Sequence, residues 1–286
     1  MTKRILGFDT SGVNALADDP DSNAIIAGLV LGYEVRLPAS SVEEIAGSSR
    51  PDRRTRLLDV CQRLLTSDGS ACIWPFHRVV ELLINEFEQK GSTFDWRSVR
   101  VRSTEYEREI VHREMVGDEL AAEQLQVVRS LEQEFAQVFN GARPRFEELF
   151  SQGTARPRTF IELLSQLQGT GGAYWLYGIG LYERVGKHRP DEAVIRQFID
   201  NCPPFRAVVL ATVLAQYERC IRDLKSGTSY RAGRIDLYMS AYLPYCDVFV
   251  TNDACQERCL REVASVGKFP TEIVGYGSLR NGLMVA

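Results

Sequence analysis

The chain has 286 residues, of which 44% are hydrophobic, so it can bury one large core or two smaller ones. A formal net charge of −4 at pH 7 gives the chain as a whole no electrostatic attraction for nucleic acid. Seven cysteines without a Cys-x-x-Cys pair, and only three histidines, argue against a zinc site and indicate reduced, mostly buried thiols in a cytoplasmic protein.

The sequence also lacks the patterns that direct a chain to or through a membrane. Lys3 and Arg4 are followed by only four apolar residues before Asp9, which is too short for a signal peptide. The longest apolar region, residues 173–181, is too short to cross a bilayer. We therefore expect a soluble protein with no membrane partner.

Strand and helix signals alternate at the start of the chain. Residues 4–8 (RILGF) predict a first strand, which ends at Asp9, where turn-forming residues begin a helix. A helical stretch at residues 24–32 and a second strand at residues 34–37 follow, and then a helix that carries Glu44. Strand, helix, strand and helix in so short a stretch predict an α/β fold with a parallel sheet.

The middle of the chain has mainly the hydrophobic period of a helix. The predicted helical segments are residues 53–65, 75–90, 104–139, 146–151, 160–168, 174–185, 191–199 and 205–224. A strand fragment is indicated at residues 72–74. We expect residues 49–231 to form an all-helical insertion, in which the mixed Glu and Arg of residues 105–134 suit a protein partner or a homo-oligomer contact better than RNA.

The last part of the chain returns to the strand and helix alternation. Asp236 opens an amphipathic helix that Pro244 is expected to stop. Residues 248–251 (VFVT) predict a buried strand, and Asp253 begins another helix. We expect residues 1–48 and 232–274 to fold together as one discontinuous α/β domain, followed by a loosely structured tail, residues 275–286.

Four acidic residues stand at predicted strand ends and helix starts, namely Asp9, Glu44 (or its neighbour Glu43), Asp236 and Asp253. In an open parallel sheet, the residues that follow the strands emerge on one edge. Four carboxylates gathered there would repel one another unless a hard cation such as Mg²⁺ or Mn²⁺ bound them. Such a cation can lower the pKa of a bound water and stabilise charge on a phosphodiester, so the pattern predicts a metal-dependent phosphodiesterase.

Each acid also has a purely structural interpretation. Ser41 and Glu44 have the spacing of a capping box, and the same spacing recurs from Asp253 to Gln256. The other two acids can bind the backbone of their own turn or helix start. Capping alone, however, does not require all four helices to open on the same edge of one sheet.

Three stretches resemble the motifs of PIN-domain nucleases. They are residues 7–16 (GFDTSGVNAL), 37–47 (LPASSVEEIAG) and 234–253 (RIDLYMSAYLPYCDVFVTND). By its place before Ile45 and Gly47, Glu44 matches the second motif better than Glu43 does. The resemblance covers the two ends of the chain.

The resemblance implies a ribonuclease that cuts single-stranded or structured RNA with Mg²⁺ or Mn²⁺. The implied metal ligands and catalytic residues are Asp9, Glu44, Asp236 and Asp253. The residues implied to position a water or a phosphate are Thr10, Ser11, Thr251 and Asn252. Two features depart from the family: residues 45–235 separate the second acid from the third, and Ala254 stands where an aromatic residue often follows the last motif. The first departure indicates an elaborated member with a helical region.

Four arginines follow the helix of Glu44, namely Arg50, Arg53, Arg54 and Arg56. They would lie beside the sheet edge and could hold substrate phosphates. They could equally form a solvated helix start that Asp52 and Asp59 balance.

Other functions remain open at this level. A non-catalytic PIN-like interaction or sensing module, whose helical insertion binds a partner, would retain the same fold, and the negative charge and Glu-rich stretch favour it. Residues 7–12 (GFDTSG) also resemble the phosphate loop of actin-like kinases and the nucleophile motif of haloacid-dehalogenase-type phosphatases. The first of these needs a β-hairpin next and the second needs a lysine near the last motif, and the sequence offers neither.

Overall fold

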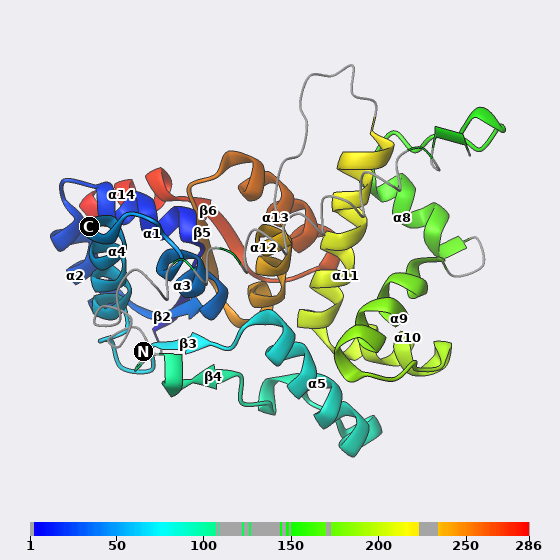
Figure 1. The fold of residues 1–286 in the computed structure, drawn as a ribbon, viewed down its shortest axis with the longest axis horizontal. Coiled ribbons are helices and arrows are strands. Elements are labelled where there is room, and N and C mark those ends of the chain that lie inside the picture. The colour runs from blue at the N-terminus through cyan, green and yellow to red at the C-terminus, as the bar shows by residue number, and fades with distance from the viewer. Residues whose placement is uncertain are drawn as a thin grey trace.

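The computed structural model describes residues 3–106, 150–169, 173–222 and 234–285, together with residues 108, 122, 126, 144, 147 and 148. The helical segments predicted at residues 104–139 and 146–151 lie mostly outside the described residues. The described chain builds a mixed sheet with helices on both faces, which confirms the predicted α/β class (Figure 1).

The sheet brings the two ends of the chain side by side. Its strands are β1 (Arg4–Phe8), β2 (Tyr33–Pro38), β3 (Ala71–Ile73), β4 (Arg102–Ser103), β5 (Val248–Thr251) and β6 (Glu272–Gly275). They lie in the order β4-β3-β2-β1-β5-β6, and every neighbouring pair is parallel except β3 and β4. Strand β1 therefore lies between β2 and β5, with Leu6 opposite Val248.

The alternation of strand side chains divides the buried residues between two cores. In β5, Val248 and Val250 belong to one core and Phe249 to the other, because successive side chains of a strand point to opposite faces. Gly7 of β1 lies against Phe249, since a Cβ atom there would be 2.8 Å from the phenyl ring. A strand of fully buried apolar residues is what a sheet covered on both faces requires.

One face of the sheet is covered by helices from the two ends of the chain. They are α1 (Thr10–Asp18), α2 (Ser22–Gly32), α3 (Ala39–Ala46), α4 (Pro51–Leu64) and α14 (Tyr276–Val285). Asp19 joins α14 to this layer: it accepts hydrogen bonds from the Tyr276 hydroxyl at 2.9 Å and from Arg280 Nε at 2.7 Å. Burial alone would raise the pKa of Asp19, but hydrogen bonds from the Asp21 amide, Tyr276 and Arg280 outweigh it and lower the pKa.

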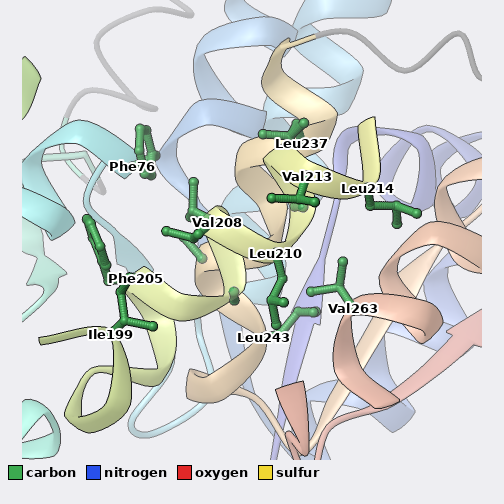
Figure 2. Close-up of a cluster of buried hydrophobic side chains, with 14 of the residues drawn as sticks. Phe76, Ile199, Phe205, Val208, Leu210, Val213, Leu214, Leu237, Leu243 and Val263 are labelled. Carbon is green, nitrogen blue, oxygen red and sulfur yellow. The ribbon is translucent and has the colours of Figure 1, made fainter. Parts of the chain in front are cut away.

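The other face carries the larger helical part. Its helices are α5 (Phe76–Lys90), α8 (Phe160–Gly169), α9 (Ala173–Gly186), α10 (Glu192–Asn201), α11 (Pro203–Gln216), α12 (Arg234–Tyr238) and α13 (Ala254–Gly267), with short 3₁₀ segments at Gly91–Thr93, Trp96–Ser98 and Met239–Tyr245. Figure 2 shows α11 at its centre, where Leu210 and Val213 lie among Leu237, Leu243 and Val263. The same core includes Phe249 of β5, so the helices pack directly onto the sheet layer.

A π-helical turn, Tyr217–Ile221, follows α11 and holds a buried carboxylate. Glu218 is 2% exposed and accepts hydrogen bonds from Arg222 at 2.7 Å and from Arg258 of α13 at 2.8 Å. This ion pair network ties α11 to α13.

Several boundaries differ from the predicted ones. Strands β3 and β4 belong to the sheet and helix α4 packs on the face opposite the helical part, so residues 49–231 are not an all-helical insertion, although α5 belongs to the helical part. The strand expected at residues 72–74 is confirmed as β3. The tail predicted to be loosely structured, residues 275–286, is mostly helix α14, because contacts with Asp19 and α2 hold it.

The expectation that Pro244 stops the helix is wrong, because Pro244 lies inside a 3₁₀ helix. The chain continues from α12 as a 3₁₀ helix, Met239–Tyr245, that contains Pro244. A 3₁₀ turn tolerates the missing proline N–H better than the middle of an α-helix does, since fewer bonds are continued through it.

All seven cysteines are free thiols, and all except Cys255 are buried, as predicted. Within the described residues, no single helix has the length and apolar character needed to cross a membrane, whereas the bent pair Glu192–Asn201 and Pro203–Ile221 meets both conditions jointly.

Candidate functional site

The candidate site lies at the edge of the sheet where the parallel strands end. Asp9 follows β1 directly, and its N–H donates to the carbonyl oxygen of Val250 in β5 at 3.1 Å. Asp253 stands two residues after β5 and begins α13. Because β1 is flanked by β2 and β5, the segments that carry Asp9, Glu44 and Asp253 leave the sheet next to one another.

Asp9 is a buried carboxylate that caps α1. Its side chain is 5% exposed, and Oδ1 accepts the Gly12 N–H at 2.7 Å and the Ser11 hydroxyl at 2.9 Å. Burial raises the pKa of Asp9, hydrogen bonds from Thr251, Gly12 and Ser11 act against that rise, and the negative charge of Asp253 adds to it.

Asp253 caps α13 in the same manner. Its Oδ1 accepts the N–H groups of Cys255 at 2.7 Å and Gln256 at 2.9 Å. The N–H of Asp253 donates to Thr251 Oγ1 at 3.1 Å, and Thr251 Oγ1 lies 3.0 Å from Ser11 Oγ. The Asn252 N–H also donates to Ser11 Oγ, at 2.7 Å. Ser11 and Thr251 thus connect the two helix caps, and both are among the predicted positioning residues.

Glu44 contacts the neighbouring helix and not its own cap. Helix α3 begins at Ala39 without a side-chain cap, so the capping box predicted from Ser41 to Glu44 is wrong. Glu44 Oε2 accepts the hydroxyl of Thr10, the residue after Asp9, at 2.5 Å. Its neighbour Glu43 accepts the Tyr106 hydroxyl at 2.8 Å instead. Of the two glutamates, Glu44 is therefore the one that contacts the residue next to Asp9.

Asp236 reaches the site through its backbone. Its carbonyl oxygen accepts the side-chain Nε2 of Gln256 at 2.6 Å, and Gln256 is only 3% exposed. This bond joins α12 to the first turn of α13, directly beyond Asp253. The sequence pattern marked Gln256 only as the last residue of a capping box, but its side chain does not return to the cap.

Carboxylates such as those of Asp9, Glu44, Asp236 and Asp253 are the kind of ligand that hard divalent cations prefer in proteins. Within the described parts of the chain, no three His, Cys, Asp or Glu side chains are grouped in a way that could hold a metal ion. Binding one cation with all four acids would therefore require their carboxylates to move closer together than they are in this structure.

The four arginines do not form one uncompensated basic surface. Arg53 donates to Asp18 at 3.2 Å, and Arg56 forms an ion pair with the same carboxylate. Arg54 is 6% exposed and donates to the carbonyl oxygen of Ser48 at 3.0 Å, which is a structural role. Arg50 is exposed at the start of α4. The balancing acid is Asp18 at the end of α1, which the sequence did not reveal because it lies outside the arginine-rich helix.

Comparisons of this chain with protein-family models, with curated proteins and with solved structures gave no match. The function is therefore inferred from the residues of the site.

Proposed function

We propose that this chain is a metal-dependent phosphodiesterase of the PIN type that cleaves RNA. The supporting observation is the hydrogen-bonded connection between Asp9 and Asp253 through Ser11 and Thr251, with Glu44 bonded to the adjacent Thr10. Capping alone explains each aspartate but not this cross-connection between α1, α3 and β5. A buried, desolvated carboxylate with a second one nearby is also typical of a functional site.

In the proposed site, Asp9, Glu44, Asp236 and Asp253 would hold Mg²⁺ or Mn²⁺. The bound cation would lower the pKa of a water and stabilise negative charge on the scissile phosphodiester. The hydroxyls of Ser11 and Thr251 fix the orientation of the two aspartates.

Two helix N-termini add to the binding of a phosphate. Helices α1 and α13 both begin at this edge, capped by Asp9 and Asp253. The N-terminus of a helix carries a partial positive charge that favours anions, although the N–H groups of Gly12, Cys255 and Gln256 already donate to the two capping aspartates. Exposed Arg50 is the proposed basic contact beside it, while phosphates would have to compete with Asp18 for Arg53 and Arg56.

Cleavage of a labelled single-stranded RNA in the presence of Mn²⁺ tests this function. We expect the parent protein to cut the RNA, EDTA to stop it, and Asp9→Asn and Asp253→Asn each to abolish cutting while the protein stays folded. Asp68→Asn is the matched control, because Asp68 is exposed and precedes β3 at the opposite edge of the sheet. Equal cleavage rates for the parent and Asp9→Asn would show that Asp9 is not part of an active site.

The alternative is a non-catalytic module in which these acids only cap helices. It is favoured by one observation: Asp9 and Asp253 each use Oδ1 to bind backbone N–H groups, as ordinary cap residues do. The two functions differ in their response to metal. A cation that binds the folded state must raise the melting temperature, so an unchanged melting temperature at millimolar Mn²⁺ would favour the module.

A further inference from the structure

We propose that Trp74 and Arg100 form a binding site for single-stranded RNA next to the candidate site, where a base stacks on Trp74 and Arg100 holds a phosphate. The identity of the substrate rests on the proposed function, whereas the binding site itself needs no metal ion. Neither residue is among those that the resemblance to PIN-domain nucleases implies.

The register of the sheet places both residues at the edge that carries the candidate site. Trp74 follows β3 directly, and β3 runs parallel to β2 and β1. Strand β4 lies beside β3 and runs the opposite way (Figure 1). Because Ile73 lies opposite Arg102, the chain passes this edge at Arg100 before it enters β4. The N–H of Trp74 donates to the carbonyl oxygen of Val101 at 3.0 Å, so the two segments are held together.

The separation from Asp9 suits a single strand of nucleic acid. Strand β2 lies between β1 and β3, and neighbouring strands are about 4.8 Å apart. The segment of Trp74 therefore leaves the sheet roughly 10 Å from that of Asp9. Successive nucleotides of a stacked strand rise about 3.4 Å, so roughly three nucleotides span this distance. One strand can thus reach from Trp74 to the acidic side chains.

The indole of Trp74 is fixed in place and still available to a ligand. Its ring packs edge to face on Tyr106, with the two ring centroids 5.5 Å apart, and its carbonyl oxygen accepts the Tyr242 hydroxyl at 3.1 Å. The side chain is only half-buried, and among the described residues its indole N–H donates to no acceptor. A fixed, partly exposed aromatic ring is what proteins use to stack the bases of a single strand.

Arg100 supplies the positive charge beside this ring. It is exposed and forms no hydrogen bond or ion pair with any residue that the structure describes. The nearby arginines are engaged: Arg102 donates to Glu34 at 3.3 Å, and the guanidinium of Arg97 lies over the ring of Trp96. Arg100 can therefore bind a phosphate without giving up another partner, and its planar fork suits phosphate oxygens.

The test is the affinity of the full chain for a labelled single-stranded RNA in EDTA, measured by fluorescence anisotropy. We expect Trp74→Leu, which keeps an apolar side chain against the core, to weaken binding roughly 5–140-fold, the range that the loss of one stacking ring produces. Trp74→Phe keeps a ring and should lose much less. Trp175→Leu is the matched control, because Trp175 of α9 is also half-buried and lies under the guanidinium of Arg196. It should bind RNA like the parent.

Two further measurements separate stacking from charge. An RNA duplex keeps its bases inside the helix, so its affinity should not change in Trp74→Leu. Arg100→Ala should reduce the slope of log affinity against log salt concentration by about 0.7, the value for one phosphate contact of a single strand. Arg189→Ala, which removes an exposed arginine paired with Glu183, should leave that slope unchanged.

The outcomes distinguish this site from the proposed function. Equal affinities of the parent and Trp74→Leu for the single strand, or an equal loss for the duplex, would overturn the site even if the parent cleaves RNA. A parent that binds the single strand through Trp74 but does not cleave it with Mn²⁺ would contradict the nuclease and retain the site. A parent that binds no RNA in EDTA overturns the site directly.

Discussion

Replacing Thr251 by valine removes a single hydroxyl from the centre of the candidate site without changing the shape of the side chain. Thr251 is fully buried. Its Oγ1 accepts the Asp253 N–H at 3.1 Å, lies 3.0 Å from the Ser11 hydroxyl, and forms a hydrogen bond that lowers the pKa of Asp9. The substitution therefore breaks contacts to both helix caps at once.

We expect Thr251→Val to lower the free energy of unfolding by about 3 kcal/mol. An N–H left without a partner costs about 1–3 kcal/mol, and a lost hydrogen bond to a charged group about 1.5–3 kcal/mol, partly offset by the added methyl group. For a chain of this size, each kcal/mol lowers the melting temperature by roughly 2–4 °C, so we expect a decrease of roughly 6–12 °C.

The loss should also depend on pH. Burial holds the pKa of Asp9 above its ordinary value of 3.8, so the folded state binds the proton more tightly and becomes less stable as pH rises between the two values. Without the hydrogen bond from Thr251, the folded pKa rises further and this window widens. The stability difference between parent and Thr251→Val should therefore be larger near neutral pH than at about pH 4.

Thermal unfolding at both pH values measures these effects, with Thr212→Val as the matched control. The Thr212 hydroxyl donates to the Val208 carbonyl within α11 at 2.8 Å, and its loss leaves no N–H unpaired. We expect that control to change stability by less than about 1 kcal/mol. Equal decreases in the two variants, or a Thr251→Val loss that does not depend on pH, would refute the connection between Thr251 and the caps.

Further predictions concern packing and charge. Gly7→Ala should lower the free energy of unfolding by about 1–3 kcal/mol, because its Cβ would lie 2.7 Å from the sulfur of Cys246. Gly180→Ala in α9, where a Cβ would meet no atom within 4 Å, should raise it by about 0.5–1 kcal/mol. Urea unfolding of both variants measures these changes. Asp19→Asn should lower the melting temperature at neutral pH, and the difference should shrink as pH falls through the lowered folded pKa of Asp19; a difference that grew in acid would contradict this. Glu218→Gln should lower the free energy of unfolding in urea by about 2 kcal/mol, because Glu218 is buried and paired with Arg222. Glu192→Gln, which alters an exposed ion pair, should leave it almost unchanged. Equal losses in the two variants would contradict a stabilising role for the ion pairs of Glu218.

Strands β1 and β5 were predicted correctly because residues 5–8 and 248–251 are short apolar runs, which are typical of strands in a parallel sheet that is covered on both faces. Strand β2 was also predicted correctly, at residues 34–37, although it carries Glu34 and Arg36. Strand β6 escaped prediction because Glu272–Gly275 is short and half exposed, and its place depends on pairing with β5. Helix α14 escaped because glycines weaken its local signal, while the contact of Arg280 with Asp19 stabilises it from a distance.

The site was predictable to the same extent. The spacing of Asp9 and Asp253 after their strands was enough to predict both helix starts and one shared edge. The contact of Glu44 with Thr10 and the bond of Gln256 to Asp236 could not be predicted, because each joins elements whose relative orientation is set by the packing of whole helices. For that reason the sequence suggested a capping box where the structure has an interhelical bond.

Capping and metal binding by these aspartates do not exclude each other. In Asp253 both backbone N–H groups bind Oδ1, and a carboxylate offers about four acceptor positions over its two oxygens, so a cap leaves acceptor capacity for a cation. The positive ends of α1 and α13 also reduce the repulsion between Asp9 and Asp253, since a helix N-terminus stabilises a nearby negative charge. The fold can therefore form without the cation that the sequence pattern alone would demand. It follows that a metal-free protein that folds is no argument against a nuclease, and that only the effect of added Mn²⁺ on stability and cleavage separates the two functions.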